Sequence, residues 1–432
     1  MTRLPPLLLL LLAACGQSPS GPQPLTIQAV ADPVETRAYQ ALIAAFEEQN
    51  PGSPVRFLPV GRHPEHVTRL ATAFAAGRPP DLFLLNFRRW GQFLGKDLLR
   101  PVGPLLSASE DWEEEAFYPQ PLEAFTVDGE LVCMPQNVSS LVVYWNRSLF
   151  REAGVPPPAA DWTWKDFHDA AVALTRDTNG DGQTDVYGLD VDPSIVRLAP
   201  FIWQAGGEIV DDLQAPTRFR LRERGGAIGL MFLKRLKTER GVIPSLNERR
   251  AEGPDARFMR GGAAMTLQSR RYTASLRAVK GLDWDVAHLP RYQQAASVLH
   301  ADAYCLAGSS PRTETAIRFI RFATSAEGQA LFAESGRIVP VRRSVAQSPA
   351  FLDPDQPPAS AAVFLEAIPL LRRTPNIPAW YEIETRINPL IEEWMFEPAA
   401  RLGAEANFGL VDGVRIASMI QREAGPLLAP AP

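Results

Sequence analysis

The first part of the chain alternates short apolar runs with amphipathic stretches, and this alternation constrains the fold more than any other feature. Apolar runs at Leu25–Val30, Val55–Val60 and Asp81–Asn86 predict three strands. Apolar side chains recur at helical spacing within 39–46, after the capping sequence Asp32-Pro33-Val34-Glu35. The order strand, helix, strand, helix, strand predicts an α/β fold with a mostly parallel sheet, in which ligands bind beyond the carboxyl ends of the strands.

A short apolar segment that ends at a cysteine opens the chain. Leu4–Ala14 is too short to span a bilayer as a helix, which takes roughly 20 apolar residues. We therefore expect residues 1–14 to be a signal peptide for export. The sequence LAAC, which ends at Cys15, resembles the lipobox of bacterial lipoproteins. The resemblance implies a lipid on Cys15, a tether at 15–24 and anchoring to the cell envelope, periplasmic or on the outer face of a membrane. The alternative is an ordinary signal peptide that contains a cysteine.

Length and charge narrow the class of protein. With 432 residues, the chain is long enough for two domains of ordinary size. Its formal net charge of -5 argues against a nucleic-acid partner, because such partners select basic surfaces. Nothing after the opening segment is long and apolar enough to cross a membrane. We expect the body of the chain to be soluble and tethered.

Three later stretches look like crossings between two lobes. In Leu131–Asn146, apolar runs flank the polar group Pro135–Ser140, and Ser297–Gly308 is a second apolar stretch. A third junction lies within Val339–Pro358. Two lobes that exchange the chain several times are the simplest account. The predicted lobes are 25–137 plus 301–343 for the first and 138–300 plus 344–432 for the second.

The two cysteines after Cys15 lie next to two of these crossings. Cys133 and Cys305 would be in a compartment where disulfides persist, if the chain is exported. Their similar positions, each beside a predicted crossing, suggest the hypothesis that they form a disulfide. Two buried thiols within strands are the alternative, because a sequence does not give the separation of two residues in space.

Several blocks of the chain resemble one known group of proteins. They are, in order, PPDLFLLN, DGELVCMPQNVSSLVVYWNRSLFREAGV, WTWKDF, FMRGGAAMTLQSR and FIRFATSAEGQALFAESGRIVP. The order of these blocks resembles that in the extracellular solute-binding proteins of ABC importers, of the maltodextrin-binding and glycerol-phosphate-binding type. The resemblance implies an α/β, two-lobed periplasmic-binding-protein-like fold with hinge strands between the lobes. It also implies closure of the lobes on a ligand, delivery to permease subunits with a separate ATPase, and no cofactor.

Polar and aromatic residues gather at the predicted strand ends and crossings. Sugar sites place aromatic faces against ring C–H groups, while amide, carboxylate and guanidinium groups bond the hydroxyls. Trp203 in FIWQAGGE is expected to offer a stacking face on a tight turn, with a core tryptophan as the alternative. The candidate ligand-binding residues are Asp32, Asn86, Arg88, Gln136, Asn137, Ser139, Trp203, Arg270, His300, Asp302 and Trp380.

The acidic segment DTNGDGQTD matches only the first half of an EF-hand calcium loop. Gly182 stands at the sharp turn, but the twelfth position is Gly188 instead of the bidentate glutamate. A solvated acidic turn is therefore favoured over a calcium site, and no other metal is expected. The residues that would hold calcium are Asp177, Asn179, Asp181 and Asp185.

These observations favour a binding protein without enzymatic activity. We expect a monomer that captures a sugar or oligosaccharide between two lobes. The alternative is a protein of the same fold that binds glycerol 3-phosphate or a phosphodiester. Arg88, Arg270 and Arg271 could pair with the phosphate group of such a ligand in bidentate fashion. The distant alternative is a secreted enzyme that acts on glycans. The chain has no glycine-rich phosphate loop, so energy for transport would come from a separate ATPase.

Overall fold

A larger sheet forms one half of the molecule. The computed structural model describes residues 23–94, 97–396 and 410–428. Strands β1 (Leu25–Val30), β2 (Val55–Val60) and β3 (Leu82–Asn86) pair in parallel, as the sequence predicts. Strand β12 (Asp302–Ala307) returns antiparallel to β3 and continues the sheet in the order β2-β1-β3-β12-β4. The short strands β4 (Leu99–Arg100) and β7 (Cys133–Pro135) both pair with β12.

Helices cover this sheet and begin where their capping signals predict. Helix α1 (Pro33–Gln49) starts at Asp32, whose side chain accepts the Val34 and Glu35 N–H groups, and Glu35 completes the capping box. Its buried face packs in a core with β1 and with two helices from late in the chain, α13 (Thr313–Ala323) and α14 (Ala326–Ala333). The other elements of this half are α2 (His63–Ala75), α3 (Phe87–Trp90), α4 (Gly103–Ser107), α5 (Pro119–Ala124), β5 (Thr126–Val127) and β6 (Glu130–Leu131).

A smaller antiparallel sheet organises the other half. Strand β8 (Val142–Asn146) lies between β9 (Met265–Gln268) and β10 (Trp284–Ala287). A separate aromatic-rich core fills this half, drawn from 141–298, 380–395 and 416–428. The helices of this half are α6 (Arg147–Glu152), α7 (Trp164–Leu174), α8 (Ile195–Gln204), α9 (Arg224–Arg240), α10 (Leu246–Ala251), α11 (Pro254–Met259), α12 (Tyr272–Arg277), α17 (Trp380–Phe396) and α18 (Leu410–Ala424).

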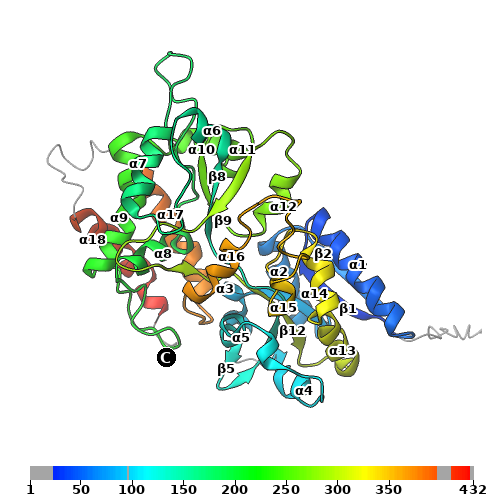
Figure 1. Cartoon of the computed structure of the whole chain (residues 1–432). Helices are drawn as coiled ribbons and strands as arrows, with labels where there is room; N and C mark the ends of the chain where they lie inside the picture. The colour runs from blue at the N-terminus through cyan, green and yellow to red at the C-terminus, as the bar shows by residue number, and fades with distance from the viewer. Residues whose placement is uncertain (1–22, 95–96, 397–409, 429–432) are drawn as a thin grey trace, which may run out of the picture.

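The chain passes between the halves more than once. It crosses from β7 to β8, and it returns from β11 (Ser297–Val298) to β12. Strand β11 pairs in parallel with β13 (Leu371–Arg372), which leads back towards α17. Helices α15 (Arg343–Ala346) and α16 (Val363–Glu366) lie between these crossings in the chain. In Figure 1 the blue and yellow elements lie together on one side and the green, orange and red elements on the other. The two lobe boundaries expected from the sequence stay a prediction.

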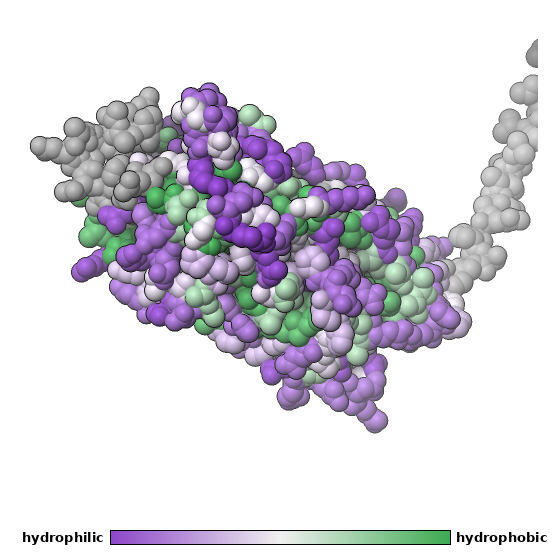
Figure 2. Space-filling model, turned by 45° about the horizontal axis from the view of Figure 1, so that its top comes forward, coloured by the Kyte–Doolittle hydropathy of each residue, from purple (hydrophilic) through white to green (hydrophobic). Residues whose placement is uncertain are grey.

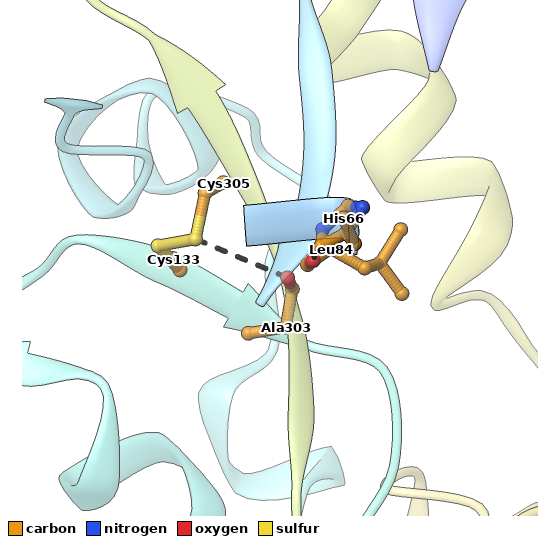
Figure 3. The surroundings of a disulfide bond; sticks show 5 residues. All are labelled: His66, Leu84, Cys133, Ala303 and Cys305. Atoms are coloured by element: carbon orange, nitrogen blue, oxygen red, sulfur yellow. Dashed lines mark hydrogen bonds between the residues drawn. A yellow bond between two sulfur atoms is a disulfide. The ribbon is translucent and has the colours of Figure 1, made fainter. Parts of the chain in front are cut away.

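A disulfide fastens the crossing strand β7 to the centre of the larger sheet. Cys133 and Cys305 face each other in the β7–β12 register and are joined by a disulfide, with their Cα atoms 4.5 Å apart. Figure 3 shows the bond beside β3, where the His66 ring meets the Leu84 carbonyl oxygen at 2.8 Å. Both cysteines are fully buried. The disulfide predicted from the sequence is confirmed.

Polar residues prevail on one face of the described part of the chain. Figure 2 shows a face where hydrophilic residues predominate and apolar ones form scattered patches. None of the helices described is both long and apolar enough to cross a membrane. The expected signal peptide 1–14, the expected lipidation site Cys15 and most of the expected tether 15–24 lie outside the described residues.

Candidate functional site

A cavity of about 220 Å³ lies where the two halves meet. Its floor is the edge of the larger sheet at which β1 and β3 end and the antiparallel strand β12 begins, so Val30, Asn86 and Asp302 lie together there. This is the edge at which a parallel sheet is expected to hold a ligand. The opposite wall comes from the smaller-sheet half, through Arg197 of α8 and Arg271 just after β9. The cavity is therefore built by both halves.

Most of the residues predicted from the sequence line this cavity. They arrive from two strand ends and from the crossing between β7 and β8, which are far apart in the chain. Their role in binding a ligand stays a prediction. The predicted residues in the lining are Asn86, Arg88, Gln136, Asn137, Ser139, His300 and Asp302.

Amide groups organise the floor around one carboxylate. Asp302 stands opposite Asn86 in the β12–β3 register and accepts hydrogen bonds from Asn86 Nδ2 at 3.1 Å and Asn137 Nδ2 at 3.3 Å. The neighbouring Gln136 amide donates to the hydroxyls of Tyr39 and Tyr304 at 2.9 and 3.0 Å. These bonds fix the orientation of each amide, so the floor presents a rigid set of donors and acceptors.

Two arginines meet the capping box of α1 at the side of the cavity. Arg271 donates to Glu35 Oε2 at 2.5 Å, and Arg337 pairs with Asp32. Arg337 also donates from Nη1 to the Arg271 carbonyl oxygen at 2.6 Å. Burial raises the pKa of Glu35 above its ordinary value, although the Arg271 charge acts to lower it. Two carboxylates of one helix end thus hold two guanidinium groups at the cavity.

Two more arginines line the cavity, and each also has a carboxylate partner. Arg88, at the start of α3, donates from Nη1 to Glu384 of α17 at 3.1 Å. Arg197 lies 3.7 Å from Asp192 and donates to Gln268 Oε1 at 3.1 Å. The Arg88 pair joins the two halves, because α3 belongs to the larger-sheet half and α17 to the smaller.

The two histidines in the lining are neutral at physiological pH. Burial lowers the pKa of His300 to about 3, and the charges of Arg88 and Arg197 add to the effect. Burial also lowers the pKa of His63 to about 4, against the opposing pull of Asp302. Both rings therefore act as neutral hydrogen-bonding groups and contribute no positive charge to the cavity.

The two tryptophans predicted to face a ligand lie in the core. Trp203 is 2% exposed within the core of the smaller-sheet half, where the Arg372 guanidinium lies 5.2 Å from the centre of its ring. Trp380 is also buried and donates from Nε1 to Glu384 Oε1 at 3.1 Å. The predicted stacking face of Trp203 was wrong, because the ring is buried in the core and the Arg372 guanidinium lies over it. Trp380 instead orients the carboxylate that holds Arg88.

Asp32 and Arg270 also lie outside the lining. The Asp32 carboxylate caps α1 and pairs with Arg337, so it acts on the cavity through that arginine. Arg270 is 1% exposed, and its guanidinium lies over the rings of Phe351 and Phe364, 4.5 and 5.3 Å from their centres. Burial lowers its pKa to about 9. The prediction that Arg270 meets a ligand was wrong, because the side chain turns into the core.

Sequence reasoning missed several residues that line the cavity. Glu35 was interpreted as a helix cap, and Tyr39 as part of the buried face of α1. Nothing in the sequence separates Arg197 and Arg337 from the other basic residues of a chain that has 44 lysines and arginines in all. The position of Glu35 at the predicted carboxyl edge of the sheet was the one signal that could have found it.

The acidic turn after α7 is exposed and bonded to itself. Asp177 accepts hydrogen bonds from the Gly180 and Gly182 N–H groups at 2.7 and 2.8 Å, and Asp185 accepts from Thr178. These bonds lower the pKa of Asp177 and that of Asp185. Within the described ranges, no group of three or more histidine, cysteine, aspartate or glutamate side chains is arranged to hold a metal ion.

Comparison with known proteins identifies the family to which the chain is similar. Residues 41–358 match the model of a family described as bacterial extracellular solute-binding protein. A binding protein of Brucella abortus is 23% identical over 351 residues, which are 80% of this chain and 81% of that protein.

Two solved structures share the fold. An ABC substrate-binding protein of Listeria monocytogenes, in complex with cycloalternan, has a TM-score of 0.80 at 24% identity, covering 92% of this chain and 98% of its own. UgpB of Mycobacterium tuberculosis, in complex with glycerophosphocholine, has a TM-score of 0.78 at 20% identity, covering 94% and 98%. The fold is thus that of the two-lobed solute-binding proteins. The family match spans well over half of the chain, and the chain belongs to the bacterial extracellular solute-binding proteins.

Proposed function

We propose that this protein captures a neutral, polyhydroxylated solute, a sugar in the first instance, in the cavity between its halves. One observation carries the proposal: the lining combines fixed acceptors with buried nitrogen atoms that have no protein partner. Arg88 Nε, Arg337 Nε and His300 Nε2 are buried without a hydrogen-bond partner, and these three residues line the same cavity as Asp302. A sugar hydroxyl donates and accepts at once, so it can satisfy both kinds of group.

The size of the cavity favours a small ligand. Its volume of about 220 Å³ is below the range of roughly 300–1,000 Å³ that is usual for ligand pockets. Tyr39 and Phe332 are the only aromatic rings other than histidine in the lining as described. Hydrogen bonding, more than stacking on aromatic faces, is therefore the basis of recognition.

The comparisons support a transport role for this capture. The Listeria relative is described as an ABC substrate-binding protein bound to a carbohydrate, cycloalternan. We infer that the present protein likewise hands its solute to ABC permease subunits driven by a separate ATPase, and that it works as a monomer without catalysing a reaction. Lipid on Cys15 would keep it at the cell envelope.

Glycerol 3-phosphate or a phosphodiester is the second candidate ligand, since UgpB of Mycobacterium tuberculosis binds glycerophosphocholine. The three arginines expected to hold a phosphate do not converge. Arg270 lies over phenylalanine rings in the core, while Arg88 and Arg271 already pair with Glu384 and Glu35. The geometry therefore favours the neutral ligand.

A panel of neutral sugars and polyols tests the proposal on the purified mature chain. We expect at least one of them to raise the melting temperature, because a ligand that binds only the folded state stabilises it. Isothermal titration calorimetry then gives its affinity, and chromatography of the mixture shows the sugar unchanged. Small-angle scattering with saturating sugar should show a smaller radius of gyration if the halves close. Conversion of the sugar into products would instead show an enzyme, and no response to any neutral compound would contradict the proposal.

A further inference from the structure

The arginines of the cavity are matched by carboxylates of the protein itself. Four guanidinium groups line the cavity, and each has a carboxylate partner at 3.7 Å or less. Arg89 follows in the chain but lies outside the lining, with its guanidinium 4.1 Å from the centre of the Tyr381 ring. The pairs in the lining are Arg88 with Glu384, Arg197 with Asp192, Arg271 with Glu35, and Arg337 with Asp32.

Asp302 adds a fifth carboxylate, and this one has no cationic partner among the described residues. Its hydrogen bonds come from the neutral amides of Asn86 and Asn137. The charge of Asp302 is close enough to Glu35 to contribute to the raised pKa of Glu35. The neutral His63 and His300 do not offset it. The Asp302 charge therefore acts on the part of the cavity that holds Glu35 and Arg271.

We propose that Glu35, with Asp302 beside it, determines specificity by excluding anionic ligands from this cavity. A phosphate or carboxylate of a ligand would need the Arg271 guanidinium, which Glu35 already holds at 2.5 Å. It would also lie next to the uncompensated charge of Asp302, and a like charge at close range costs free energy. A neutral hydroxyl meets neither obstacle. This inference rests on the proposed function and names the substrate class that the site accepts.

The test compares two substitutions at equivalent helix positions. Glu35→Gln removes the charge but keeps an oxygen that can complete the capping box, since glutamine serves at that position. Asp166→Asn is the matched control, because Asp166 holds the same position in the exposed capping box of α7. Each variant and the unaltered chain are titrated with glycerol 3-phosphate, with inorganic phosphate and with the neutral sugar panel, near pH 7 and at low salt.

We expect no thermal shift of the unaltered chain or of Asp166→Asn with either anion. Glu35→Gln should gain affinity for glycerol 3-phosphate by about tenfold or more, which is about 1.4 kcal/mol, and lose that gain at high salt. Tight binding of an anion by the unaltered chain, or no gain in Glu35→Gln, would overturn the inference. If Glu35→Gln does not fold, Asp302→Asn carries the same test with the same expected gain. The titrations with anions are read separately from those with sugars. If Glu35→Gln gains affinity for the anion but no sugar binds to any of the chains, the proposed function is refuted and the inference about Glu35 is not.

Discussion

The helix ends of α1 and α7 carry the same local motif in opposite surroundings. Both begin with a capping box, Asp32 with Glu35 in α1 and Thr163 with Asp166 in α7. Burial raises the pKa of Glu35, whereas the hydrogen bond from the Thr163 N–H lowers the pKa of the exposed Asp166. The motif determines where each helix begins, and the surroundings determine what its carboxylate can do.

The residues behind the two helix ends differ as well. Behind α7 lies an aromatic core, in which Trp164 stacks on Phe232 with ring centres 4.1 Å apart and donates to Gln204 at 2.6 Å. At the end of α1 lies the polar cavity with its paired arginines. We therefore expect substitutions near α7 to change stability without changing binding, and substitutions near α1 to change binding more than stability.

Trp203→Ala should give the largest effect, and on stability alone. The side chain is fully buried in the core next to α7, and emptying such a site typically costs about 3–5 kcal/mol. Chemical denaturation should show that loss, while the fraction that remains folded binds the sugar as before. Loss of binding at unchanged stability would place Trp203 at a ligand and break the distinction between the two regions.

Asp302→Ala should have the next largest effect, this time on binding. Loss of a charged acceptor for sugar hydroxyls costs about 1.5–3 kcal/mol, a weakening of roughly ten- to hundredfold. Calorimetry with the best compound of the sugar panel measures it. Asp161→Ala is the control, because that carboxylate is 83% exposed and lies in the smaller-sheet half. Equal affinities of the two variants would show that the sugar does not bind in this cavity.

The strands and first helices could be predicted from the sequence because their signals are local. Alternating apolar runs and a capping box are read within a few residues, and the structure places β1, α1 and β3 at the expected positions. The rule that ligands bind at the carboxyl edge of a parallel sheet points to Asn86, and the predicted crossing within 297–308 points to Asp302, which the structure places opposite Asn86. The disulfide followed from the same crossings.

The aromatic and basic candidates failed because burial is a property of the packed molecule. Trp203 and Trp380 are aromatic residues of the kind that stack on sugars, yet both rings are buried in the core of the smaller-sheet half. Arg270 and Arg271 are adjacent in the chain, and one turns into the core over Phe351 while the other reaches Glu35. The direction of each side chain depends on the turn after β9, which the sequence pattern does not specify. Because the sequence does not show that Arg271 reaches Glu35, Glu35 was recognised only as a helix cap.

The two capping carboxylates should titrate in opposite directions from their ordinary values. Glu35 should titrate above 4.5, because burial is the dominant cause, and Asp166 below 3.8. The folded state therefore holds the proton on Glu35 more tightly than the unfolded chain, so the contribution of Glu35 to stability rises as the pH falls through its raised pKa. The contribution of Asp166 is present above 3.8 and is lost as the pH falls through its lowered pKa. Carboxyl-detected NMR titration of both residues checks this, and shifts of the same sign would contradict it.

Thr163→Ala should have the smallest effect and is the most direct test of whether the two regions are independent. Its side chain accepts the Asp166 N–H at the start of α7, and loss of such a cap costs about 1 kcal/mol. Thr163→Ser should restore that stability, because serine offers the same hydroxyl. Sugar affinity should be equal in all three chains, since neither the cap nor its partner lines the cavity. A change in sugar affinity without a change in stability would mean that the end of α7 is coupled to the cavity across the smaller-sheet half. The difference between substitutions near α1 and near α7 would then reflect their distance from the ligand more than the side chains that surround each helix end.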